Sequence, residues 1–153
     1  MRLIRQSENL WQYQLSKNET DILNSLVKKF PFHDNGPVQI SKIEKDAKTV
    51  EREHLLADSL TEHRKELKKL AVQLLGPEKW KVGPKGNMLT LSSASREVLL
   101  QLLNDIRVGC WHALGEPESL DVPITTKTAF GYRNLMDLAG VFEMSLLEPE
   151  EQE

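Results

Sequence analysis

The residues with the clearest chemical potential lie in one apolar stretch, residues 99–115 (LLQLLNDIRVGCWHALG). It contains an Asn104-Asp105-x-Arg107 cluster, the only cysteine of the chain, Cys110, and a histidine, His112. An acid, a thiol and an imidazole are the groups that nucleophilic and acid–base catalysis use. Their value for catalysis depends on whether one helix can bring them to the same side.

Helical spacing separates these groups. Two positions apart on a helix correspond to about 200° of rotation, so Cys110 and His112 cannot form a nucleophile–base pair. For the same reason Asp105 and Arg107 do not form a local ion pair. The four histidines show neither H-x-x-x-H nor H-E-x-x-H spacing, and no second cysteine exists. We therefore expect a protein that is not an enzyme, with no catalytic residue, metal or cofactor. An enzyme whose site is not visible in the sequence is kept as a third hypothesis, after the protein-binding and nucleic-acid-binding hypotheses given below.

Arg107 and Trp111 extend the apolar arc of this helix, whose central stripe is Leu99, Leu103, Ile106, Cys110 and Leu114. An unpaired guanidinium in an apolar arc is costly. Arg107 should therefore either extend outward along Trp111 or meet an acid. The candidate acids are Asp58, Glu97, Asp137 and Glu143. We predict that Arg107 and Trp111 form a structural polar clamp that fixes how the last two helices dock.

The polar side of the same helix is the candidate partner surface. It consists of Gln101, Asn104, Asp105 and His112. Because these side chains are predicted to point away from the core stripe, they are available to contact another protein.

The rest of the chain alternates extended and helical patterns. Residues 2–6 and 10–15 predict a β-hairpin, and Ser16 with Glu19 predicts a capping box that begins a helix reaching about residue 30. A turn-rich connector follows over residues 31–45. Residues 46–75 are helical, but their apolar face rotates by about 130° along the segment. This segment is either two helices or one helix that packs on two different neighbours.

A second hairpin is predicted from residues 79–82 and 88–91, with a five-residue turn over 83–87. Ser92 or Ser93 then caps the central helix, and Thr125 or Thr126 caps a last helix that reaches about residue 147. The fold class predicted is mainly α: a helical bundle of four to five helices with one or two short β-hairpins. Residues 1–147 form a single α-rich domain, and residues 148–153 form a disordered acidic tail.

Composition places the chain among ordinary soluble proteins, with 39% apolar and 28% charged residues and a net charge of −3. No apolar run approaches the roughly 20 residues of a membrane span, and no secretory signal is visible at the N-terminus. A single cysteine fits a reducing compartment. We expect a cytoplasmic protein with no membrane contact.

One alternative function is nucleic-acid binding through the second hairpin. Lys79, Lys81 and Lys85 surround Trp80, and an aromatic residue among lysines can stack on bases. The acidic balance of the whole chain argues against direct nucleic-acid binding.

A family resemblance adds to this interpretation. The pattern L-x-x-L-N-D-[IL]-R-x-x-x-x-x-x-L-G, here LQLLNDIRVGCWHALG over residues 100–115, resembles the helix signature of the actinobacterial AosR-type regulators. That family is a bacterial domain of unknown function. The order of the other elements agrees, including the aromatic start of the last helix at Phe130 and Tyr132. The resemblance implies a non-enzymatic regulatory or adaptor protein that acts through protein partners, in transcription or stress response.

The chain departs from a thiol-switch version of that family, because Cys110 stands alone on the predicted core stripe. The expected partner is thus another protein. A homodimer is a second possibility, if the first hairpin does not cover the rotated apolar face of residues 46–75.

Overall fold

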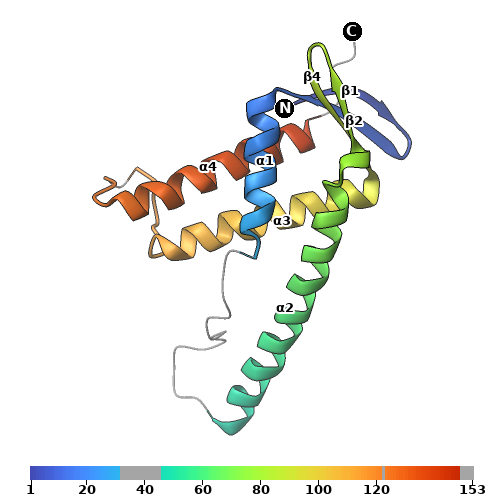
Figure 1. Cartoon of the computed structure of the whole chain (residues 1–153). Coiled ribbons are helices and arrows are strands. Elements are labelled where there is room, and N and C mark those ends of the chain that lie inside the picture. Colours follow the sequence, from blue (N-terminus) through green and yellow to red (C-terminus); the bar gives the residue numbers. More distant parts are fainter. Residues whose placement is uncertain (32–45, 122, 149–153) are drawn as a thin grey trace.

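Helices dominate the structure. The computed structural model describes residues 1–31, 46–121 and 123–148, and about 65% of these described residues are helical. The predicted connector (from residue 32) and the acidic tail (from residue 149) lie outside the described residues. The elements, shown in Figure 1, are β1 (Arg2–Ser7), β2 (Leu10–Leu15), α1 (Lys17–Lys29), α2 (Ala47–Leu74), the short 3₁₀ helix η1 (Pro77–Lys79), β3 (Trp80–Gly83), β4 (Gly86–Ser92), α3 (Ser93–Ala113) and α4 (Lys127–Leu147).

Both predicted hairpins are present, and they join into one antiparallel sheet with the strand order β1-β2-β4-β3. The mainly α class is confirmed, but the sheet is larger than one or two separate hairpins. The reason lies in the register between β2 and β4, where Trp11 pairs with Leu91 and Tyr13 with Leu89. Each strand carries its apolar residues on alternate positions, so pairing them places all four side chains on the same face.

The predicted five-residue turn of the second hairpin is wrong. Gly83 pairs with Gly86, which leaves only Pro84 and Lys85 as the turn. Gly86 has a φ of +125°, and a Cβ at this position would collide with the carbonyl oxygen of Leu15 in β2. Glycine is therefore required both by the tight turn and by the close approach of the neighbouring strand.

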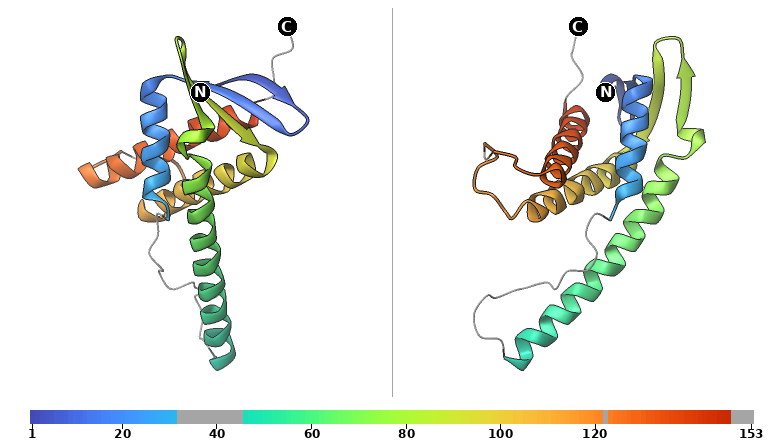
Figure 2. Two further views of the ribbon diagram at one scale, coloured as in Figure 1. Left: turned by 45° about the vertical axis from the view of Figure 1, so that its right-hand side comes forward. Right: turned by 60° about the vertical axis from the view of Figure 1, so that its left-hand side comes forward.

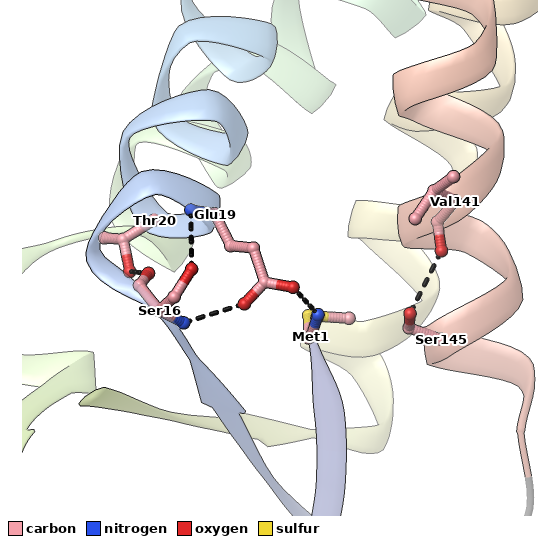
Figure 3. A network of polar contacts seen from close by, with 6 residues as sticks. All are labelled: Met1, Ser16, Glu19, Thr20, Val141 and Ser145. Atoms are coloured by element: carbon pink, nitrogen blue, oxygen red, sulfur yellow. Dashed lines mark hydrogen bonds and ion pairs between the residues drawn. The ribbon is translucent and has the colours of Figure 1, made fainter. Parts of the chain in front are cut away.

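The predicted capping box at the start of α1 is confirmed (Figure 3). The amide of Glu19 donates to Ser16 Oγ over 3.2 Å, and the amide of Ser16 donates to the Glu19 carboxylate over 2.7 Å. The same carboxylate pairs with the amino group of Met1, which lies between α1 and the part of α4 where Ser145 donates to the Val141 carbonyl. Partial burial favours a higher pKa for Glu19, but these contacts together lower its pKa.

One buried cluster unites the inner face of the sheet with α1, α3, α4 and the C-terminal half of α2. The end of α4 is fastened to the sheet through the carbonyl of Leu146, which accepts from Arg96 Nε over 2.8 Å and from the Tyr13 hydroxyl over 3.4 Å. The Arg96 guanidinium also lies 5.1 Å from the Trp11 ring centre. These contacts fix the position of α4 relative to α3, whose N-terminus carries Arg96.

Residues 46–75, for which one helix or two remained open, form the single helix α2 of 28 residues. It is about 42 Å long at 1.5 Å per residue. Its C-terminal half buries Leu67, Ala71 and Leu74 in the core. Its N-terminal half projects away from the other elements (Figure 2). We call residues 47–63 the arm. His63 shares the direction of the apolar residues Leu60 and Leu67, a position typical of a packed histidine, but it is exposed.

Candidate functional site

α3 is the centre of the molecule and carries most of the candidate residues. Ser92 caps it by accepting from the Ser95 amide over 3.1 Å. Of the predicted apolar stripe, Leu99, Leu103, Ile106 and Cys110 are each exposed by 1% or less, as is the neighbouring Leu102. Leu114, the last member of the stripe, is only half-buried. α3 packs against α4 along its length and also contacts α1, α2 and β4. Side chains off this stripe are therefore held by a rigid scaffold.

Arg107 extends from α3 across α4. Its Nη1 pairs with Glu143 Oε2, so among the four acids considered the partner is Glu143. The arginine side chain is 46% exposed and the glutamate side chain 10% exposed. The arginine thus lies half in solvent while the acid is buried. Its stem passes over Gly140, where an added Cβ would stand 3.7 Å from Arg107 Nε.

Trp111 lies one turn after Arg107 on the same side of α3. Its Nε1 donates to the Pro117 carbonyl over 3.2 Å, and its ring is half-buried. This bond holds the loop after α3 against the helix. The structure thus gives both clamp residues a specific polar contact, while their role in fixing the docking of α3 and α4 stays a prediction.

An apolar groove lies beside this pair, lined mainly by residues of α3 and α4. We call it the α3–α4 groove; it has a volume of about 480 Å³. Val141 and Met144 are 59% and 66% exposed, and Val108 and Leu120 are 44% and 41% exposed. The residues lining it are Asn104, Arg107, Val108, Trp111, Leu120, Met136, Asp137, Gly140, Val141 and Met144.

The sequence interpretation missed the α4 side of this groove. In the sequence, the apolar residues of the last helix that share one direction at helical spacing are Leu135, Leu138, Ala139, Phe142 and Leu146. Val141 and Met144 do not belong to this stripe. The available signal was that both are apolar although they lie off that stripe. A surface helix needs only one apolar stripe to pack on the core, so apolar residues off that stripe indicate an exposed apolar surface.

The four residues of the candidate partner surface do not share one open face. Asp105 Oδ1 lies 3.6 Å from Arg64 Nε on α2, and its side chain is only 25% exposed. Gln101, Asn104 and Asp105 line a second groove of about 430 Å³, the α2–α3 groove, together with Leu60, His63, Arg64, Leu67 and Val108. His112 is not among the residues that line either groove. Its Nδ1 lies 2.7 Å from Glu116 Oε1 in the loop after α3.

The candidate nucleic-acid residues are also divided. Lys79, Lys81 and Lys85 are exposed, but Trp80 is half-buried against the core. The Trp80 indole donates to the Leu75 carbonyl over 3.3 Å. In the register of the sheet, Lys81 instead belongs to a row formed with Met88, Gln14 and Arg2.

Cys110 is fully buried, and this burial raises the pKa of its thiol to about 11. The thiol is therefore protonated at neutral pH. Among the described residues, no group of three or more His, Cys, Asp or Glu side chains is arranged to hold a metal ion.

No family model matches the chain, and searches of curated proteins and of solved structures give no significant match. In the part of the chain that the structure describes, no helix combines the length and the apolar character that crossing a membrane requires.

Proposed function

We propose that this chain is a non-enzymatic regulatory or adaptor domain of the cytoplasm that binds another protein in the α3–α4 groove. The observation that supports this proposal is the exposed apolar surface of the groove, centred on Val141 and Met144. Contiguous apolar surface of this kind on a soluble domain is typical of protein-binding sites. Two methionines in the lining, Met136 and Met144, add a flexible and polarisable surface that adapts to a partner.

The shape and charge of the groove favour an amphipathic helix as the bound segment. Two helices form its walls, and a third helix can place an apolar face between them. The charged groups at the groove are already paired, Arg107 with Glu143 and Asp137 with Arg133. A bound segment therefore needs apolar anchors more than compensating charges. From the sequence resemblance to AosR-type regulators, the proposed role is in transcription or stress response.

The test combines crosslinking with a matched pair of variants. A photo-crosslinking residue in place of Met144 should capture a protein partner in cells that express the chain, and one in place of Val72 should not. The captured segment is then titrated against the purified protein. Val141→Glu should weaken binding at least about tenfold, whereas Val72→Glu, at a valine of α2 that is 63% exposed, should leave it unchanged.

Two results would overturn this proposal. The first is that the photo-crosslinking residue at position 144 captures no more protein than the one at position 72. The second is that the captured segment binds the Val141→Glu variant as tightly as it binds the original chain. The first result would mean that the groove has no partner, and the second that the partner binds elsewhere.

Nucleic-acid binding is the second candidate, supported by the outward face of the sheet rather than by Trp80. Arg2, Arg5 and Lys81 occupy positions of this face, beside Gln12 and Gln14. Binding carried by these three cations should weaken with salt at a log–log slope of about −2 to −3. Lys81→Glu should reduce both the affinity and the slope. No binding to mixed oligonucleotides at low salt would exclude this candidate.

A further inference from the structure

α2 carries a second apolar stripe that the single chain covers only in part. Leu56, Leu60, His63, Leu67, Leu70 and Leu74 recur alternately four and three residues apart. This is the spacing of a coiled-coil seam. Leu67 and Leu74 are buried in the core, but Leu56 in the arm is 41% exposed. Glu53, one turn earlier, is already buried, so the open part of the stripe runs from Leu56 to His63.

A groove opens beside the end of the open stripe. Leu60 and His63 form one wall of the α2–α3 groove, and Gln101 and Asn104 of α3 belong to the opposite wall. The arm projects beyond the other elements, so a helix can approach it from outside the molecule (Figure 2).

We propose that a second copy of this chain occupies this surface, with the two α2 arms packed antiparallel about a two-fold axis near Asp58. In this arrangement Leu56 of each copy lies opposite Leu60 of the other. The contact is isologous, because both copies use the same surface and every contact occurs twice.

The residues that flank the stripe are compatible with this symmetry. Ala57 and Ser59 would meet their own counterparts at the axis, and both are small and uncharged. Arg52 and Glu66 lie two heptads apart on the same flank. In an antiparallel pair this flank of one helix lies beside the same flank of the other helix. Arg52 of each copy therefore approaches Glu66 of the other. The Glu66 side chain is 63% exposed, and its contact with Lys69 at 3.8 Å does not block it.

The first experiment measures the mass of the purified full chain by sedimentation over a range of concentrations. We expect a species of twice the 17.5 kDa chain mass. Leu56→Glu should weaken the dimer at least about tenfold. Leu55→Glu is the matched control, since Leu55 is 64% exposed and points away from the stripe. This variant should dimerise like the original chain.

The second experiment is a charge exchange. Arg52→Glu should weaken the dimer, and combining it with Glu66→Arg should restore it. In addition, a short bifunctional maleimide should join two Ser59→Cys chains but not two Leu55→Cys chains. Cys110 does not interfere, because it is buried.

Several results would overturn the inference. A monomer at all concentrations would mean that no second copy occupies the stripe. This antiparallel arrangement would be excluded if Leu56→Glu and Leu55→Glu weakened the dimer equally. It would also be excluded if Glu66→Arg did not restore the dimer in the Arg52→Glu variant. The α3–α4 groove is a separate surface, so Val141→Glu should leave the dimer intact whether or not the proposed function is correct.

Discussion

α3 and the arm of α2 are both helical and both rich in leucine, but they are stabilised in different ways. In α3, Leu102 and Leu103 are fully buried between other elements. In the arm, Leu55 and Leu56 are 64% and 41% exposed. Helical stability in proteins comes mainly from packing of an apolar face, so α3 is held by its own chain. Among the described residues the arm has no comparable packing, and Leu55 and Leu56 remain exposed.

The largest expected difference between the two regions is in the free energy of unfolding. Leu103→Ala removes a fully buried side chain and should cost about 2–5 kcal/mol. Leu55→Ala should change the same quantity by less than about 0.5 kcal/mol. Urea unfolding followed by circular dichroism measures both, at a concentration low enough to avoid association. Similar costs for the two variants would mean that the arm is packed as tightly as α3.

Thiol labelling compares the same two regions without disturbing the core. The raised pKa of Cys110, about 11, leaves about one thiol in a thousand ionised at pH 8. Maleimide should therefore modify Cys110 in the folded chain at least about a hundredfold more slowly than a cysteine introduced by Leu55→Cys. Equal rates at the two positions would contradict the burial of α3.

The Arg107–Glu143 pair should make an intermediate contribution. Arg107→Ala leaves the buried Glu143 without this partner, but the arginine is half exposed, so solvent screens part of the interaction. We expect a loss of about 1–2 kcal/mol in unfolding free energy. A double-mutant cycle with Glu143→Gln measures the coupling between the two side chains. A coupling energy of zero would show that the pair does not fix α4 on α3.

The smallest differences concern the helix caps. Ser92→Ala at the start of α3 should cost about 1 kcal/mol of global stability. Asp46→Ala should only fray the beginning of the arm. Hydrogen bonds from Thr49 lower the pKa of Asp46, so its contribution is complete above the ordinary pKa and disappears as the pH falls through the lowered value. NMR amide shifts of residues 47–50 should follow this titration, and a global loss of stability in Asp46→Ala would contradict it.

Local features were predictable from the sequence, and long-range contacts were not. Ser16 and Glu19 fixed the start of α1 because a capping box involves only one turn. The pairing of β2 with β4 brings residues about 75 apart into register, and local periodicity does not encode it. Likewise, the helical spacing gave Asp105 a polar direction but did not show that α2 would face it.

The central claim is that apolar side chains left open by the single chain are binding surfaces, and hydrogen exchange tests it most directly in the arm. Exchange of amides 50–63 should slow as the protein concentration rises, whereas exchange of amides 99–110 in α3 should be slow and independent of concentration. If the arm exchanges as slowly as α3 in dilute solution, or rapidly at every concentration, no second copy covers it and the claim fails for the arm.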